Sequence, residues 1–63
     1  HCKAQVQARI RALVQSEDPA SPLSDGDLVQ RLRHEGIAVS RRVAAKYRQD
    51  SGIARAALRR KSA

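Results

Sequence analysis

Basic side chains are concentrated in one short stretch of the sequence, VSRRVAAKYRQ at residues 39–49. Five of these eleven residues are Arg, Lys or Tyr, and the stretch follows a glycine at position 36. An arginine presents a planar fork that matches the O6 and N7 acceptors of guanine in the DNA major groove, whereas a lysine can hold a phosphate. The chemistry that these residue types indicate is recognition of a polyanion.

The charge of the chain is distributed unevenly. Its 63 residues include 13 Lys and Arg and 6 Asp and Glu, which gives a net charge of +7. Residues 1–35 carry five basic and five acidic side chains, whereas residues 36–63 carry eight basic side chains against Asp50 alone. Concentrated positive charge favours nucleic acid or an acidic surface as the partner. Charge alone leaves a second interpretation open, a solvated surface that keeps a small protein soluble.

Residue types needed for a metal site or for catalysis are sparse. Cys2 is the only cysteine, so the chain can form neither an internal disulfide nor a cysteine cluster for zinc. His1 and His34 do not stand at ligand spacing, and we expect no metal and no other cofactor. Glu35 and Asp50 are acid–base types, but no nucleophile accompanies them. The sequence therefore does not predict an enzyme.

Signals for targeting or membrane insertion do not occur in the sequence. No apolar run approaches the roughly 20 residues of a membrane span, and there is no signal-peptide pattern. The lone cysteine is typical of a reducing, intracellular setting. We therefore expect a cytoplasmic protein with no membrane partner.

Apolar spacing and cap residues predict three short helices, near residues 3–16, 25–35 and 41–50. The first contains an apolar stripe at helical spacing that comprises Val6, Ile10, Leu13 and Val14. Two prolines follow it and force a turn. Ser24 and Ser40 are N-cap candidates for the next two helices. Gly36 and Gly52 end these helices, because glycine adopts the positive φ of a helix C-terminus at little cost.

These elements predict an all-α fold, a small three-helix bundle with a helix-turn-helix whose third helix is the recognition helix. We expect the bundle in residues 1–51 and a basic, flexible tail in residues 52–63. The residues that we expect in one core are Ile10, Leu13, Leu28, Leu32, Val43 and Tyr47. A helical bundle without a role in DNA binding is the alternative.

The third predicted helix has two different faces. At 100° per residue, Ala44 and Tyr47 lie on one side, with Val43 beside them. Tyr47 is the only aromatic residue, and a single ring suits a core anchor better than a base-stacking surface. The opposite side, which we expect to be exposed, carries Arg42, Ala45, Lys46 and Gln49.

The beginning of the third helix is the part that a recognition helix points into the groove. Arg41 and Arg42 stand there and are the candidates for reading base edges. The small Ala45 lets the helix approach the bases closely. Lys46 and Arg48 lie further along and are candidates for phosphate contacts, which position a protein on DNA without specifying sequence.

Residues 40–49, SRRVAAKYRQ, resemble the ARRTVAKYRE signature of the sigma-N (RpoN, sigma-54) factors of bacterial RNA polymerase, a motif known as the RpoN box. The identical positions are Arg41, Arg42, Ala45, Lys46, Tyr47 and Arg48. EDPASPLSD at residues 17–25 is similar to the acidic-proline loop of this family and the PLSD that follows it. The resemblance covers about residues 10–50.

The resemblance implies a function. In this family the domain is a helix-turn-helix that binds the minus-24 GG element of a promoter, and the box forms the recognition helix. Arg41 and Arg42 are then the readers of the two guanines. The residues that we expect at the DNA are Ser40, Arg41, Arg42, Ala45, Lys46, Arg48 and Gln49. Contacts with the RNA polymerase core and with an activator ATPase would be made by regions absent from this chain.

Two departures from the family pattern accompany the resemblance. The chain has Val43-Ala44 where the family has Thr-Val, and Ile53-Ala54-Arg55-Ala56 where the family often has Ile-Pro-Ser-Ser. A second hypothesis from another class also stays open, a basic helical interaction module that binds an acidic protein partner or RNA. It accounts for the charge but not for the capped helix after the glycine turn.

Overall fold

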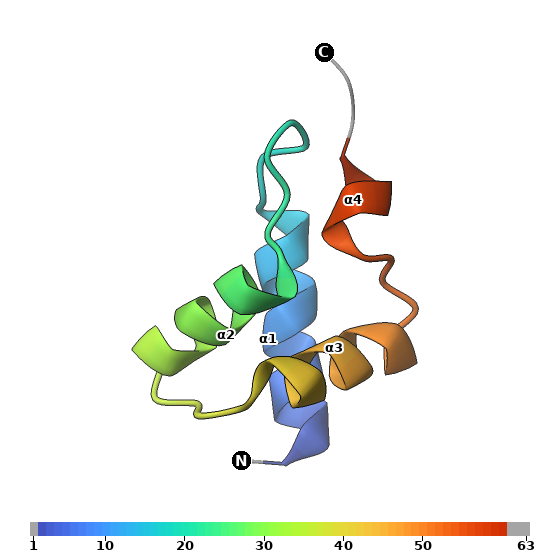
Figure 1. Ribbon diagram of the computed structural model, residues 1–63. Coiled ribbons are helices and arrows are strands. Elements are labelled where there is room, and N and C mark those ends of the chain that lie inside the picture. Colours follow the sequence, from blue (N-terminus) through green and yellow to red (C-terminus); the bar gives the residue numbers. More distant parts are fainter. Residues whose placement is uncertain (1, 61–63) are drawn as a thin grey trace.

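The computed structural model describes residues 2–60, and these residues form four helices (Figure 1). The helices are α1 (Lys3–Gln15), α2 (Asp25–His34), α3 (Arg41–Asp50) and α4 (Ala56–Arg59). The all-α fold is confirmed, and each of the three helices expected from the sequence begins at the predicted residue. The described residues contain no strand, only an isolated bridge between Asp18 and Ser21 in the loop after α1.

The first three helices form the bundle. Each of them contacts the other two, and Figure 1 shows α2 and α3 lying across α1. A short turn at residues 35–40 joins α2 to α3, which is the connection of a helix-turn-helix. The third helix is therefore held from two sides by α1 and α2, and its remaining side faces solvent.

A serine side chain caps each helix of the helix-turn-helix, as the sequence predicts. Ser24 Oγ accepts a hydrogen bond from the Asp27 amide at 3.1 Å, and the Asp27 carboxylate accepts one from the Ser24 amide at 3.1 Å. Ser40 Oγ accepts from the Val43 amide at 3.1 Å. These bonds satisfy donors that the first turn of a helix leaves without an intrahelical partner, and so fix where α2 and α3 begin.

The turn between α2 and α3 depends on a glycine in the left-handed conformation. Gly36 has a φ of 82°, as its place after the helix predicts. The amide of Gly36 donates to the Arg33 carbonyl at 3.0 Å, and the amide of Ile37 donates to the Leu32 carbonyl at 2.9 Å. This pair of bonds is the Schellman motif. It ends α2 and directs Ile37, which is buried, into the core.

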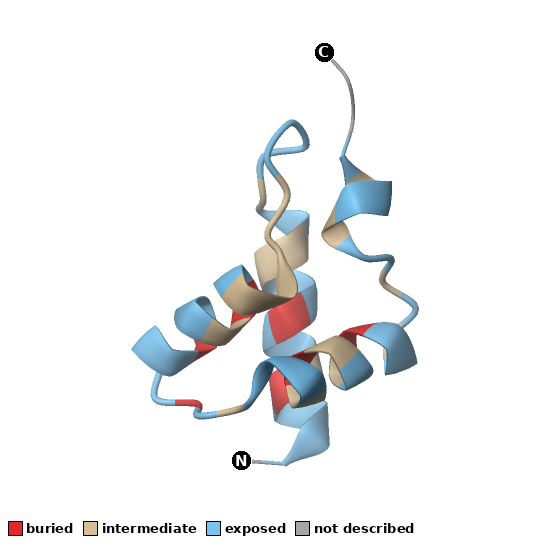
Figure 2. Cartoon of the chain, in the orientation of Figure 1, coloured by how far each residue is buried: buried red, intermediate tan, exposed pale blue. Residues whose placement is uncertain are grey.

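The core lies where the three long helices meet, as the buried segments in Figure 2 show. Its buried apolar residues are Val6, Ile10, Leu28, Leu32, Ile37 and Ala44. Leu13 and Tyr47, which were predicted in the core, are half-buried and pack against it. The prediction that Val43 belongs to this core is wrong, because α3 turns Ala44 and Arg48 inward and leaves Val43 half-buried beside them.

The segment after α3 packs back on the chain as far as it is described. Ile53 packs against the core, and α4 is held by Arg59. The Arg59 guanidinium donates to the Glu17 carboxylate at 2.9 Å and to the Leu23 carbonyl at 2.6 Å. This contact fastens α4 to the loop before α2. Residues 61–63 of the predicted tail, like His1, lie outside the described residues.

Replacing Gly36 with alanine should test the turn. A Cβ at this position forces a left-handed conformation on an L-residue, so we expect the free energy of unfolding to fall by roughly 1–2 kcal/mol. Chemical denaturation followed by circular dichroism measures the change. Gly26→Ala is the matched control, because its φ is not positive and its Cβ would meet no atom closer than 3.5 Å. Equal losses in the two variants would contradict the role of the turn.

Candidate DNA-binding surface

One side of α3 carries the polar and basic residues that were predicted to be exposed there. Arg42, Lys46 and Gln49 are exposed and Ala45 is half-buried. We call these four residues the outer face of α3; their spacing of three, four and seven residues places them on one side of the helix. The small side chain of Ala45 leaves the helix backbone accessible among longer side chains. The shape and charge of this face suit an approach to a polyanion.

Arg41 is also exposed but occupies a different place. A Cβ built on Gly26 would lie 3.5 Å from Arg41 Nε and 3.7 Å from Arg41 Cζ, so the guanidinium rests over the first turn of α2. A Cβ at position 26 would be in ordinary contact with this guanidinium, so the position does not require a glycine. Arg41 therefore stands at the border between α2 and α3, whereas Arg42 stands on the outer face. Ser40, just before them, is exposed and accepts the capping bond with its hydroxyl.

Arg48, which was predicted to hold a phosphate, lies in the interior. Its side chain is 6% exposed, and Nε donates to Asp25 Oδ1 at 2.8 Å. Nη1 donates to the Ile53 carbonyl at 2.8 Å. The expectation that this arginine faces the DNA is therefore not what the structure shows. Arg48 is buried because it lies one turn after the core residue Ala44, and its side chain therefore points toward the first turn of α2.

Tyr47 joins α3 to α1 from the opposite side. Its ring packs against the core, and Lys3 Nζ lies 5.6 Å from the ring centroid. The same ammonium is 2.8 Å from Asp50 Oδ2. Gln7 Nε2 donates to the Tyr47 carbonyl at 3.4 Å. These contacts agree with the prediction of a core anchor, and they use the tyrosine ring inside the protein rather than at a binding surface.

All six acidic side chains of the chain are engaged in contacts within the protein. Four of them form salt bridges, which are Lys3–Asp50, Arg9–Glu35, Arg48–Asp25 and Arg59–Glu17. The other two accept backbone hydrogen bonds, Asp27 from Ser24 and Asp18 from Ala20. No carboxylate in the described chain forms a salt bridge with the outer face of α3. The acidic residues thus brace the fold and leave this face positive.

The contacts of these carboxylates also keep them ionised. Hydrogen bonds from Arg59 hold the pKa of Glu17 below its usual range although the carboxyl group is largely buried. A hydrogen bond from Lys3 lowers the pKa of Asp50, and one from Arg9 lowers the pKa of Glu35. The backbone amide of Ser24 lowers the pKa of Asp27. At neutral pH these groups are therefore ionised.

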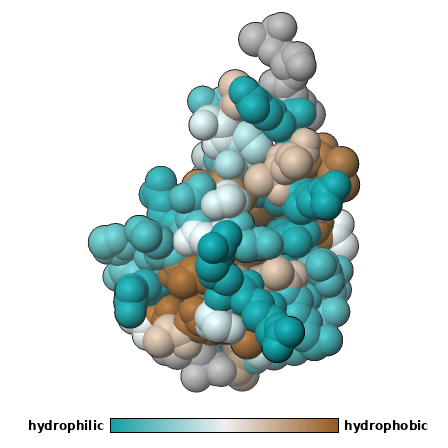
Figure 3. Space-filling view, in the orientation of Figure 1, coloured by the Kyte–Doolittle hydropathy of each residue, from teal (hydrophilic) through white to brown (hydrophobic). Residues whose placement is uncertain are grey.

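The basic side chains that remain are the ones available to a ligand. Those of residues 2–60 that form no salt bridge are Arg11, Arg31, Arg33, Arg41, Arg42, Lys46, Arg55 and Arg60. Three of these residues lie in α3, and no other helix has more than two, even when the residues that flank it are included. Figure 3 shows a band of hydrophilic surface over α3, with apolar surface between α2 and α3. The face of the helix-turn-helix is thus basic with a small apolar border.

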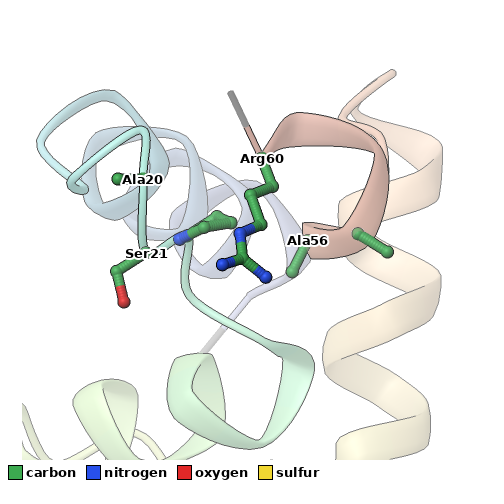
Figure 4. A pocket seen from close by; sticks show the side chains of 6 residues that line it. Ala20, Ser21, Ala56 and Arg60 are labelled. Atoms are coloured by element: carbon green, nitrogen blue, oxygen red, sulfur yellow. The ribbon is translucent and has the colours of Figure 1, made fainter. Parts of the chain in front are cut away.

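Metal-ligating side chains do not cluster in the part of the chain that the structure describes. No three His, Cys, Asp or Glu side chains gather there as metal ligands would. A hollow between α4 and the loop that joins α1 to α2 is lined by Ala20, Ser21, Pro22, Ala56, Ala57 and Arg60. In Figure 4 the Arg60 side chain lies among the small side chains that line this hollow. Among the helices described, none has the length and apolar character to cross a bilayer.

Comparison with known protein families agrees with this geometry. The family described as "Sigma-54, DNA binding domain" matches residues 1–61 of the 63. The chain belongs to the sigma-54 DNA-binding domain family. The resemblance of residues 40–49 to the RpoN box is thereby confirmed as family membership, and α3 is the helix that carries the box. The family is one of DNA-binding domains and not of enzymes.

Curated relatives extend the sigma-54 assignment. RNA polymerase sigma-54 factor 1 of Bradyrhizobium diazoefficiens is 43% identical over 61 residues, which are 97% of this chain and 13% of the relative. The RNA polymerase sigma-54 factor of Xanthomonas euvesicatoria is 46% identical over 48 residues, 76% of this chain and 10% of the relative. The factor of Escherichia coli is 44% identical over the same shares. The chain thus spans about an eighth of the length of the relatives that it matches.

Sequence reasoning missed Asp25 as a structural partner within this sigma-54 domain. Its place at the start of the second predicted helix indicated no partner. The pairing with Arg48 joins residues 23 positions apart, and no local pattern predicts such a contact. An acidic residue in the first turn of α2 was the only signal in the sequence.

The buried pairing predicts different roles for two neighbouring basic residues of α3. Arg48→Ala leaves Asp25 without its partner in a site where that side chain is 28% exposed, so we expect a loss of roughly 3 kcal/mol in unfolding free energy. Lys46→Ala, on the outer face, should change it by less than about 0.5 kcal/mol. Urea denaturation of both variants measures the difference. An Arg48→Ala variant as stable as Lys46→Ala would show that Arg48 is not part of the fold.

Proposed function

We propose that this domain reads the minus-24 GG element of promoter DNA, with α3 in the major groove. The observation that supports the proposal most is the pair of arginines at the capped start of α3, Arg41 and Arg42, neither of which has a salt bridge. Each guanidinium is free to donate to guanine O6 and N7. The beginning of a recognition helix is the part that reaches base edges. A cytoplasmic setting follows from a promoter target.

The other residues proposed at the DNA have supporting roles. Lys46, further along the outer face, holds a backbone phosphate, and Ala45 permits close approach of the helix. Gln49, on this face, and Ser40, which borders it, can donate to phosphates, because a serine hydroxyl that accepts a capping bond still has its proton. Arg48 is omitted from the contact set, since Asp25 and the Ile53 carbonyl occupy its guanidinium. Its part is to hold α3 in place.

Further partners are proposed for the longer protein rather than for this chain. The names of the relatives refer to RNA polymerase, and the chain matches about an eighth of their length. We propose that binding of the polymerase core and of an activator ATPase belongs to other parts of such a protein. This domain would then supply promoter recognition for transcription initiation by an alternative sigma factor.

Alanine variants should separate base reading from phosphate binding. If Arg41 and Arg42 donate to guanines, replacing either should cost on the order of 1–3 kcal/mol on a duplex with the GG element and much less on a scrambled duplex. Lys46→Ala should weaken both duplexes alike and lower the salt slope by about one. Fluorescence anisotropy with labelled duplexes at several salt concentrations measures both quantities.

Two outcomes would contradict the proposal. Equal weakening of the two duplexes by Arg41→Ala and by Arg42→Ala would mean that the start of α3 grips DNA by charge alone. Absence of binding to either duplex, with binding to an acidic protein or to RNA, would instead support the alternative of a basic interaction module. Circular dichroism of each variant serves as the control for folding.

A further inference from the structure

A second basic site borders α3 on the side of α2. An open hollow of about 390 Å³ lies between the two helices and has room for a phosphodiester group. Its lining residues are Ser24, Gly26, Asp27, Val29, Gln30, Arg33 and Arg41. Two of these are arginines without a salt bridge, one from each helix. Arg33 does not belong to the outer face of α3.

The carboxylates near Arg33 are occupied elsewhere. Glu35, two residues along, accepts two hydrogen bonds from Arg9 at 2.6 and 2.8 Å and so faces α1. Asp27 lines the hollow, but its carboxylate accepts from the Ser24 amide, and among basic side chains it is Arg31 whose charge acts on it. Arg33 thus keeps its full charge at the mouth of the hollow. A negatively charged group is the chemistry that completes this site.

The place of the hollow in the motif decides which anion would occupy it. In a helix-turn-helix the second helix lies in the major groove while the first crosses the sugar-phosphate backbone. Arg33 is in the last turn of α2, next to the turn that leads into α3. When the first turn of α3 enters the groove, this hollow faces the strand at the edge of the groove. A backbone phosphate therefore comes within reach of Arg33.

We infer that Arg33 binds a DNA backbone phosphate in the hollow between α2 and α3, so that the domain grips DNA with two helices. The inference rests on the proposed function, in which α3 enters the major groove. Arg33 contributes affinity without sequence preference, because a phosphate is the same for every base pair. Gln30, one helical turn before Arg33 on the same hollow, is placed to donate to the same phosphate.

The helix itself offers a matched control for Arg33. Arg31 is two residues earlier, about 200° around the helix, and lines a neighbouring hollow with Ser21, Pro22, Leu23 and His34. Asp27 and Gln30 border both hollows, whereas Arg41 lines only the one that contains Arg33. Neither arginine forms a salt bridge, and both are exposed. Arg33→Gln and Arg31→Gln therefore change the net charge equally, but only Arg33→Gln alters the hollow that Arg41 lines.

The two glutamine variants should differ in their binding of DNA. With the 63-residue chain and duplexes with and without GG, we expect Arg33→Gln to weaken both about 3- to 10-fold near 0.1 M salt and to lower the salt slope by about one. The ratio of the two affinities should not change. Arg31→Gln should leave affinity and slope close to those of the unaltered chain. Circular dichroism confirms that both variants are folded.

The possible failures are distinguishable. If the unaltered chain prefers the GG duplex but Arg33→Gln and Arg31→Gln behave alike, the phosphate site is overturned while the proposed function stands. If Arg33→Gln changes the GG preference and not the salt slope, Arg33 contacts a base and the inference is also overturned. If the unaltered chain binds neither duplex, the proposed function itself fails and the site has no role.

Discussion

The guanidinium of Arg48 connects the parts of the helix-turn-helix that must keep a fixed relation. It bonds to Asp25 in the first turn of α2 and to the Ile53 carbonyl after the end of α3. Ala44, one turn earlier, is fully buried and lets α3 approach the other helices closely. The angle of α3 therefore depends on one buried charge pair and one small side chain. The side of α3 that faces solvent, and the residues it presents, follow from that angle.

The contacts of the acidic side chains make the surface charge of the domain uneven. Every acidic side chain forms a salt bridge or accepts a backbone hydrogen bond. The salt bridges connect α1 with α3, α1 with the turn after α2, α2 with α3, and α4 with the loop before α2. The basic residues left over include those at the start of α3 and on its outer face. Salt bridges with the acidic residues thus stabilise the fold, and the basic residues that form no salt bridge leave its surface positive. Salt weakens the exposed charges more than the buried ones, so DNA binding should be more sensitive to salt than folding is.

Local signals predicted most of the fold, and spatial contacts decided the rest. Ser24, Ser40 and Gly36 act within a few residues of the chain, so their roles could be derived from the sequence. The exposed places of Arg42 and Lys46 follow from helical periodicity alone. Periodicity places Arg48 one turn after Ala44, on the core side, but its charge and the family resemblance favoured a phosphate contact, and its buried partner Asp25 is 23 positions away. The docking of α4 through Arg59 and Glu17, 42 positions apart, has the same cause.

The central claim is that the arginines of this domain divide into those that hold the fold and those that meet DNA. An NMR spectrum of the arginine Nε–H groups, recorded with and without a GG duplex, tests it most directly. We expect the signals of Arg48 and Arg59 to be protected from solvent in the free domain and unmoved by DNA, because both groups are already bonded within the protein. The signals of Arg41 and Arg42 should exchange rapidly in the free domain and shift on binding. A large shift of Arg48 with Arg42 unchanged would contradict the account.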